Sequence, residues 1–118
     1  MKYNIIQEKS FSFSVRIVNL TRYLKANKKE AVLSNQILKS GTSIAANVSE
    51  AIGSISKSEF SSKISISYKE AQETKFWLNL LYKTDSISEK QHKSLIYDCE
   101  EILKILFVIL KKTRMDKK

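Results

Sequence analysis

The chain of 118 residues contains no proline and only two glycines. Folds built on β-sheets reverse direction every ten residues or so, and their turns are made largely with Gly, Pro, Asn and Asp. A chain with so little Gly and Pro is better suited to a few long helices. A single cysteine also excludes an internal disulfide, and with it the oxidised scaffolds of small secreted proteins. Because this length suits one folding unit, we expect residues 1–118 to form a single all-α domain.

Hydrophobic periodicity divides the chain into four segments. Apolar residues that recur at spacings of three and four predict helices over residues 10–24, 30–52, 57–83 and 88–112. Since the connections are short, sequential helices should run antiparallel, which gives an up-down-up-down four-helix bundle. The predicted core positions are Phe11, Phe13, Val15, Ile17, Val18, Leu20, Leu24, Leu33, Ile37, Ser40, Ile44, Val48, Ala51, Ile55, Phe60, Ile64, Ser67, Ala71, Thr74, Leu78, Leu81, Leu95, Cys99, Ile102, Leu106 and Ile109.

Local signals mark the ends of these helices. Gly53 predicts the end of the second helix. Ser56 precedes Glu59 by three residues, and Ser88 precedes Gln91 by three, which is the spacing of a capping box at a helix start. The basic C-terminal tail, Lys111 to Lys118, is expected to fray.

Gly41 lies in the middle of the second predicted helix. Glycine is unfavourable there by about 1 kcal/mol relative to alanine, so its presence indicates that another helix approaches closely. A local break in the helix at Gly41 is the alternative.

The segment from Ile102 to Leu110 is apolar at eight of its nine positions. A bundle helix normally keeps one face in contact with water, so the second face of this segment should be covered. The segment is too short to cross a bilayer, which takes about 18 apolar residues or more. We therefore expect self-association. The predicted interface residues are Gly41, Ile105, Phe107 and Val108.

The chain carries 21 Lys and Arg against 12 Asp and Glu, a net charge of +9. Such an excess attracts polyanions, although a compositional bias toward lysine would give the same charge with no partner. In an antiparallel bundle the first and third connections share one end. The predicted nucleic-acid-binding residues are Arg22, Lys25, Lys28, Lys29, Lys83, Lys90 and Lys93 at that end, and Lys111, Lys112, Arg114, Lys117 and Lys118 at the opposite end, where Lys2, Lys9 and Lys57 are also expected.

No catalytic or metal-binding arrangement is evident in the sequence. His92 and Cys99 are the only residues of their kinds, and on one helix they lie about 10 Å apart along the axis. Glu89 and His92 match the Glu-x-x-His pair of di-iron bundles, but such a site requires two copies. Glu70 and Glu73 share a helix face, which we interpret as hydrogen bonding between helices or to a neighbouring subunit. We expect no enzymatic activity, no metal, no cofactor and no small-molecule substrate.

The first residues of the chain lack the apolar segment of a signal peptide, and no apolar stretch is long enough for a membrane span. The expectation is a cytoplasmic protein without a membrane partner.

Three ordered blocks of sequence, residues 11–18, 33–51 and 63–78, resemble a known family. It consists of bacterial four-helix-bundle proteins encoded in intervening sequences of 23S rRNA genes, and the resemblance covers roughly residues 10–110. It implies an antiparallel four-helix bundle that assembles as a homopentamer and has no established enzymatic activity. The fold is similar to that of the accessory protein of diversity-generating retroelements, a basic pentamer that binds nucleic acid and a reverse transcriptase. Lys39 stands where the family usually has arginine, and lysine lacks arginine's planar fork.

Two functions from different classes remain open at this point. The first is a non-enzymatic oligomeric bundle that associates with RNA or DNA through its basic surfaces. The second is a structural scaffold that binds another protein and has no role with nucleic acid.

Overall fold

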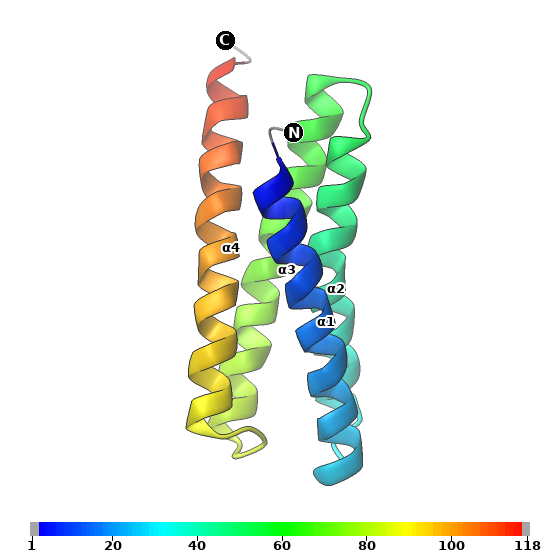
Figure 1. Ribbon diagram of the computed structural model, residues 1–118, viewed down its shortest axis with the longest axis vertical. Coiled ribbons are helices and arrows are strands. Elements are labelled where there is room, and N and C mark those ends of the chain that lie inside the picture. The colour runs from blue at the N-terminus through cyan, green and yellow to red at the C-terminus, as the bar shows by residue number, and fades with distance from the viewer. Residues whose placement is uncertain (1–2, 117–118) are drawn as a thin grey trace.

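The computed structural model describes residues 3–116, and side chains up to residue 113. Within this range the chain forms four helices: α1 (Asn4–Asn27), α2 (Val32–Ile52), α3 (Lys57–Lys83) and α4 (Glu89–Asp116). Successive helices run antiparallel (Figure 1), so the α1–α2 and α3–α4 connections meet at one end and the α2–α3 connection lies at the other. The predicted all-α, antiparallel four-helix bundle is confirmed. The bundle measures 49 × 22 × 20 Å along its principal axes.

Two of the predicted helix boundaries differ from the structure by four residues or more. The first helix begins at Asn4 instead of residue 10, because Ile6 continues the buried row of α1 one turn further than the sequence indicated. The last helix continues to Asp116 instead of ending at residue 112. Thr113 supports this extension, since its hydroxyl donates hydrogen bonds to the Leu110 carbonyl (2.9 Å) and to Ser61 Oγ (3.4 Å). The tail that was expected to fray is therefore helical as far as residue 116, and residues 117–118 lie outside the described range.

The predicted caps are present at the starts of α3 and α4. Ser56 Oγ accepts a hydrogen bond from the Glu59 amide at 3.0 Å. At the start of α4 the box closes in both directions, since Ser88 Oγ accepts from the Gln91 amide and Gln91 Oε1 accepts from the Ser88 amide. Each bond satisfies a backbone donor that a helix start leaves free. These two short sequence signals were sufficient to locate both helix starts.

Among the described residues, the backbone positions with left-handed φ are occupied by residues other than glycine. Gly53 caps the end of α2 with a φ of −85°, an ordinary value for any residue. Left-handed backbone occurs instead at Lys29 (φ 53°) and Asp85 (φ 60°), one in each of the two connections that share an end of the bundle.

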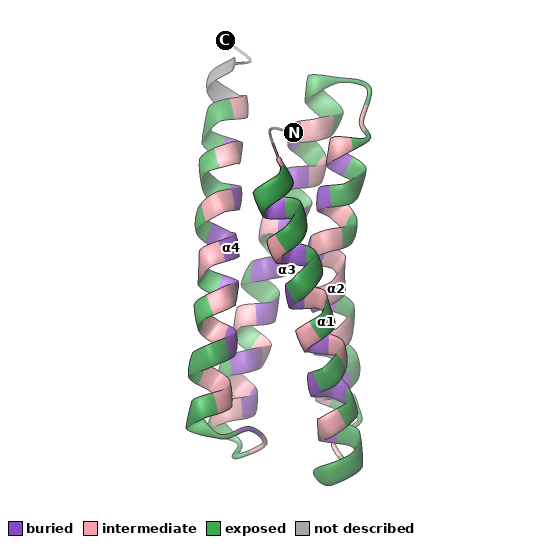
Figure 2. Cartoon of the chain, in the orientation of Figure 1, coloured by how far each residue is buried: buried purple, intermediate pink, exposed green. Residues whose placement is uncertain are grey.

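Most predicted core residues are buried along the inward-facing sides of the helices (Figure 2). Buried are Phe13, Ile17, Leu20, Leu24, Ile37, Ser40, Ile44, Val48, Ala51, Ile64, Ser67, Ala71, Thr74, Leu78, Leu81, Leu95, Cys99, Ile102 and Leu106. Phe11 and Val15 are exposed, because the row they form on α1 points away from α2 and α4. Ile55 is 96% exposed, because it follows Gly53 in the connection and is no longer on the helix. Val18, Leu33, Phe60 and Ile109 are half-buried.

The apolar segment of α4 is covered on most of its circumference by the chain itself. Ile102, Leu103, Leu106 and Leu110 are buried, and Ile105 and Ile109 are half-buried. Phe107 and Val108 remain 53% and 64% exposed. The surface available to a second copy is thus smaller than the sequence indicated.

Gly41 lies inside the bundle, and α2 continues through it without a break. A Cβ atom at Gly41 would come within 2.8 Å of Ile17 Cγ2 on α1. The close approach predicted from the sequence is therefore an internal contact between α1 and α2. Because Gly41 is buried in its own chain, it is removed from the predicted oligomer interface.

Candidate nucleic-acid interface

The charged residues are unevenly distributed along the bundle. We define the waist as residues 8–16 of α1, 39–50 of α2, 63–75 of α3 and 98–104 of α4. Its basic residues are Lys9, Arg16, Lys39, Lys63, Lys69, Lys75 and Lys104, and its acidic residues are Glu8, Glu50, Glu70, Glu73, Asp98, Glu100 and Glu101. Since these sets are equal in size, the waist has no net charge. The whole excess of +9 therefore comes from residues outside the waist.

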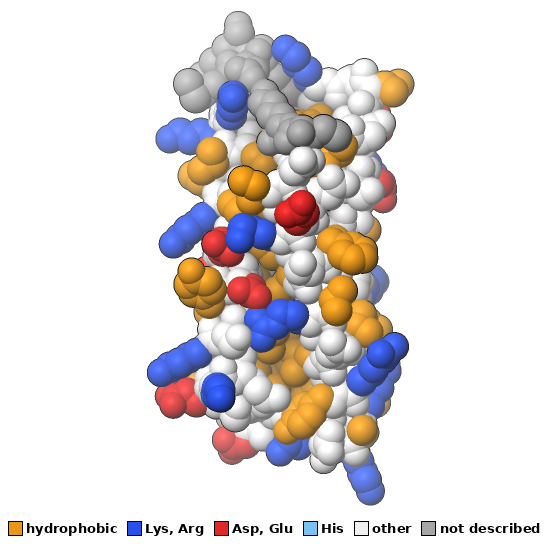
Figure 3. Space-filling view, in the orientation of Figure 1, with side chains coloured by type: hydrophobic (Ala, Val, Ile, Leu, Met, Phe, Trp, Pro, Cys, Tyr) orange, Lys and Arg blue, Asp and Glu red, His pale blue; other side chains and the backbone are white. Residues whose placement is uncertain are grey.

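Ion pairs between helices account for much of this balance. Lys63 contacts Glu50 at 2.8 Å, and Lys75 contacts Glu100 at 3.2 Å. Across the α1–α4 seam, Lys9 contacts Glu101 at 3.0 Å and Arg16 contacts Asp98 at 2.7 Å. The hydrogen bonds to Glu101 and Glu50 raise the pKa values of Lys9 and Lys63. Figure 3 shows basic and acidic side chains mixed over the middle of the face that presents α1.

The loop end, as we call the end with the α1–α2 and α3–α4 connections, has the opposite character. Its basic residues are Arg22, Lys25, Lys28, Lys29, Lys83, Lys90 and Lys93, and every one is exposed. Among the described residues only Lys93 of this set forms an ion pair, with Glu89 at 4.0 Å. The carboxylates of this end are those of Glu30, Asp85 and Glu89, and Glu30 already accepts a hydrogen bond from the Leu33 amide. The structure thus brings together the predicted residues of both connections, with most of their cations unpaired.

The terminal end is the opposite one, where α1 starts and α4 finishes (Figure 1). Lys57, Lys111 and Lys112 are exposed there. The other residues predicted for this end, Lys2, Arg114, Lys117 and Lys118, lie outside the part of the chain whose side chains the structure describes. Lys9 does not belong to it, because its ammonium is held by Glu101 in the α1–α4 seam.

Two hollows that the sequence did not predict lie along the α1–α4 seam. The waist hollow has a volume of about 280 Å³ and is lined by Glu8, Lys9, Ser12, Phe13, Asp98, Glu101 and Ile102. The loop-end hollow has a volume of about 290 Å³ and is lined by Arg16, Asn19, Leu20, Tyr23, Gln91 and Leu95. No sequence signal could have located them, because their existence depends on how far α1 and α4 stand apart.

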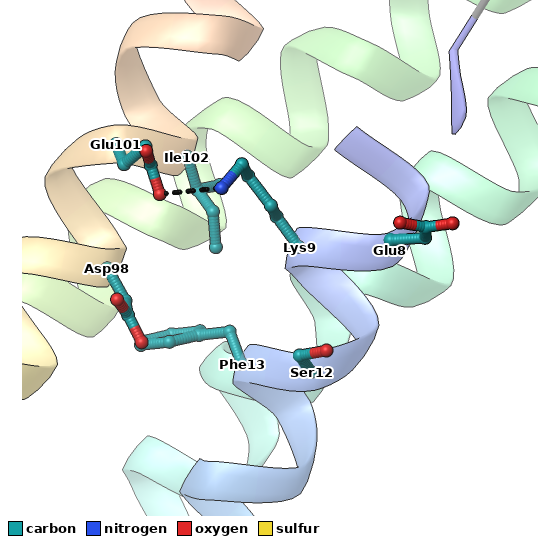
Figure 4. Close-up of a pocket in the computed structure, with 7 residues that line it drawn as sticks. All are labelled: Glu8, Lys9, Ser12, Phe13, Asp98, Glu101 and Ile102. Carbon is teal, nitrogen blue, oxygen red and sulfur yellow. Dashed lines mark hydrogen bonds and ion pairs between the residues drawn. The ribbon is translucent and has the colours of Figure 1, made fainter. Parts of the chain in front are cut away.

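The Lys9–Glu101 ion pair spans the waist hollow. Figure 4 shows Lys9 reaching from α1 to Glu101 on α4, while Glu8 points away from them. Phe13 and Ile102 supply its apolar lining. Asp98 is held by Arg16, so the cations here are already paired with carboxylates. Such a site provides no unpaired cation to bind a phosphate.

The residues that suggested chemistry in the sequence have structural roles. His92 hydrogen bonds to Asn79 Oδ1 at 2.8 Å and stacks on Tyr82, with ring centroids 4.5 Å apart. Cys99 is buried, and its thiol donates to the Ala71 carbonyl at 3.4 Å. Burial raises the pKa of Cys99 to about 12, which keeps the thiol protonated and poorly nucleophilic.

The carboxylates of α3 do not form the hydrogen bonds between helices that the sequence suggested. Glu73 Oε2 accepts a hydrogen bond from Trp77 Nε1 of the same helix at 3.2 Å. Burial, assisted by the nearby Glu73, raises the pKa of Glu70. Bonds between α2 and α3 come instead from the hydroxyl groups of Ser67 and Thr74 and from the Lys63–Glu50 ion pair.

Two further structural findings apply to the described residues. No three His, Cys, Asp or Glu side chains gather there in a way that could hold a metal ion. None of the four helices, over the residues described, is both long enough and apolar enough to span a membrane.

Comparison with known proteins places this fold in a family. Among curated proteins, none is similar to the chain. A crystal structure of a protein of unknown function from the S23 ribosomal protein family of Bacteroides thetaiotaomicron VPI-5482 is similar over 90% of this chain and 98% of that one, with 47% sequence identity and a TM-score of 0.89. The model of the family described as 23S rRNA-intervening sequence protein matches residues 2–108. The chain therefore belongs to the family of 23S rRNA-intervening sequence proteins.

Proposed function

We propose that this chain is a non-enzymatic, oligomeric bundle protein that binds nucleic acid, RNA in the first place, through its basic ends. The observation that supports this proposal is the segregation of charge, with a neutral waist between two basic ends. Exposed lysines that have no carboxylate partner can replace the counterions of a phosphate backbone, and release of those counterions favours binding. The paired cations of the waist would first have to leave their carboxylates.

The same distribution favours assembly side by side. Two ends of like charge repel each other in an end-to-end contact, whereas a neutral waist does not oppose a lateral one. Exposed apolar side chains lie on the sides of the bundle, among them Phe11, Tyr97, Phe107 and Val108. We propose a ring of five copies, the number implied by the family resemblance, which would repeat each basic end around a rim. Light scattering coupled to size exclusion tests this, and a mass near 13.6 kDa would contradict it.

The binding proposal is tested by titrating labelled single-stranded RNA and DNA of equal length at about 50 and 200 mM salt. The expected result is binding that weakens steeply with salt, by a log–log slope of about 0.7 per phosphate neutralised on a single strand. Absence of binding at micromolar protein and low salt would contradict it.

Two charge-matched variants locate the binding surface. The loop-end variant carries Lys25→Gln, Lys28→Gln and Lys83→Gln, and the waist variant carries Lys39→Gln, Lys69→Gln and Lys104→Gln. All six lysines are exposed, and none forms an ion pair with a described residue, so both variants lose the same charge without losing a contact. The loop-end variant should show a smaller salt slope, whereas the waist variant should bind like the parent chain. Equal losses in both would indicate that net charge alone attracts the nucleic acid.

The scaffold function is the second candidate, and the exposed apolar side chains on the sides of the bundle favour it. It predicts a defined oligomer without affinity for RNA or DNA. The titration and the light-scattering measurement together therefore separate the two functions.

A further inference from the structure

The loop-end hollow combines features that its neighbour in the seam lacks. Leu20 and Leu95 form an apolar floor, with 6% and 4% of their surface exposed. Tyr23 stands at one side as a half-buried aromatic ring. No carboxylate lines this hollow, whereas Glu8, Asp98 and Glu101 line the waist hollow.

The polar side chains of the loop-end hollow retain hydrogen-bonding capacity. Asn19 makes no side-chain hydrogen bond to any residue in the described part of the chain, so its amide can both donate and accept. Gln91 uses its carbonyl oxygen to accept from the Ser88 amide, which leaves its NH₂ group free to donate. Arg16 closes the hollow on the waist side, since its guanidinium is fixed to Asp98 at 2.7 Å and to Ser94 Oγ at 2.8 Å.

Two cations lie close in sequence to residues that line the hollow, without lining it themselves. Arg22 follows Asn19 by three positions and shares its side of α1, while Lys90 precedes Gln91 on α4. Both are exposed, and neither is paired with a carboxylate among the described residues. A ligand in this hollow would therefore have a flat ring over the leucines, polar edges toward the amides and a negative charge toward the rim.

We propose that the loop-end hollow is a pocket for one unpaired nucleobase of a bound single strand. Tyr23 stacks on the base, Asn19 and Gln91 contact its polar edge, and Arg22 and Lys90 contact the adjacent phosphates. A base in a duplex is already stacked and paired, so the pocket selects single strands, and aromatic stacking is how proteins commonly hold them. This inference rests on the proposed nucleic-acid function and adds the ligand's chemical class to it.

The test uses the full chain and a labelled oligouridylate, alongside an oligomer of the same length and charge in which the bases are absent. Tyr23→Leu removes the aromatic ring while keeping an apolar side chain over the floor. Its affinity for the oligouridylate should fall about 5- to 150-fold, the range for loss of one stacking aromatic. The salt slope should stay unchanged, because no phosphate contact is removed. The oligomer without bases should bind the parent chain and Tyr23→Leu equally.

Two further variants protect this test. Asn19→Ala alters an exposed residue and should weaken oligouridylate binding without affecting folding, so it serves if Tyr23→Leu fails to fold by circular dichroism. Tyr82→Leu is the matched control, because Tyr82 is a half-buried tyrosine like Tyr23 but does not line the hollow. It should bind like the parent chain.

The outcomes distinguish the pocket from the proposed function. If the parent chain binds both oligomers equally and Tyr23→Leu and Asn19→Ala have no effect, the pocket proposal is overturned while the nucleic-acid function stands. If the parent chain binds neither oligomer at low salt, both proposals fail. RNA and DNA oligomers of one sequence then show whether the ribose contributes.

Discussion

The seams that α2 makes with its neighbours differ in kind from the seam between α1 and α4. Along α2 the helices meet through small residues and buried hydroxyls: Gly41 lies against Ile17, Thr74 donates to Ser40 Oγ at 2.9 Å, and Ser67 donates to the Ile44 carbonyl at 2.8 Å. The α1–α4 seam is the least extensive of the four and is held by ion pairs at its surface. The two hollows described above lie where α1 and α4 stand apart. The proposed binding and the closest packing therefore belong to different sides of the bundle.

The largest effect is expected where α2 packs most closely. Gly41→Leu should destabilise the protein by about 1–3 kcal/mol, because even its Cβ would overlap Ile17 and the seam would have to widen. The free energy of unfolding in denaturant measures this. Gly53→Ala is the matched control, since an added Cβ there meets nothing closer than 3.7 Å and should stabilise the chain by about 0.4–1 kcal/mol. A Gly41→Leu variant with a raised melting temperature would show that the seam is not tight.

A smaller loss is expected from the buried hydroxyl pair of the α2–α3 seam. Thr74→Val removes a hydroxyl that hydrogen bonds both to Ser40 Oγ at 2.9 Å and to the Glu70 carbonyl at 2.8 Å. It should cost about 1 kcal/mol, because Thr74 and Ser40 are fully buried. The same change at Thr42 is the control, since its hydroxyl bonds only to carbonyls of its own helix. A double-mutant cycle with Ser40→Ala isolates the coupling. If the two threonine variants behave alike, the bond between helices contributes nothing specific.

The α1–α4 seam should tolerate loss of an ion pair better. Arg16 and Asp98 are each more than a third exposed, so Arg16→Gln should cost only about 0.2–1 kcal/mol, and this loss should shrink in about 1 M salt. Lys104→Gln on α4 provides the charge-matched control, because Lys104 is exposed and has no ion-pair partner among the described residues. A loss that is large and insensitive to salt would mean that Arg16 packs as part of the core.

The difference between the seams also explains what the sequence could predict. The α3 row from Ile64 to Leu81 has strict heptad spacing and is buried as expected, because α3 packs on both neighbours with small residues that allow one register. The capping boxes are equally local and correctly locate two helix starts. On α1, by contrast, two apolar rows lie side by side. Nothing within that helix decides that Phe13 faces inward and Phe11 outward, because the positions of α2 and α4 decide it.

Of the candidate site, only the clustering of basic residues at the loop end could be predicted from the sequence. Bundle topology alone gathers the loop-end lysines, and the structure places them together as the sequence indicated. The pairing of Lys9 with Glu101 joins residues 92 positions apart, beyond any local pattern. The sequence offers Tyr23, Phe76 and Tyr82 as aromatic candidates for base stacking, but each fits packing within the bundle better. An aromatic and an amide on a helix become a pocket only when α4 stands away from α1, so the role of Tyr23 with Asn19 depends on the structure.

The smallest effect is expected at Glu70, a partly buried carboxylate of α3 whose pKa is raised. Burial is the main cause that raises the pKa of Glu70 above its ordinary value of 4.5, with Glu73 adding to it and Lys69 and Lys39 opposing it. Because the folded state holds this proton more tightly than the unfolded chain, the contribution of Glu70 is fully present below about pH 4.5 and is lost as the pH rises through the folded pKa.

At neutral pH the ionised Glu70 therefore opposes folding, and Glu70→Gln should raise the free energy of unfolding by about 0.5 kcal/mol or less. The gain should shrink toward about pH 3, well below the ordinary pKa of 4.5, because the parent side chain is then protonated as well. Thermal melts at the two pH values measure this, with Glu8→Gln as a control that removes the same charge from an exposed position on α1. An equal gain from Glu8→Gln would assign the effect to net charge, and a loss from Glu70→Gln would mean that the ionised carboxylate has a stabilising partner. A gain confined to Glu70 at neutral pH would show that the closely packed side of the bundle partly desolvates an ionised carboxylate. A carboxylate on the open α1–α4 seam would stay hydrated and carry no such cost.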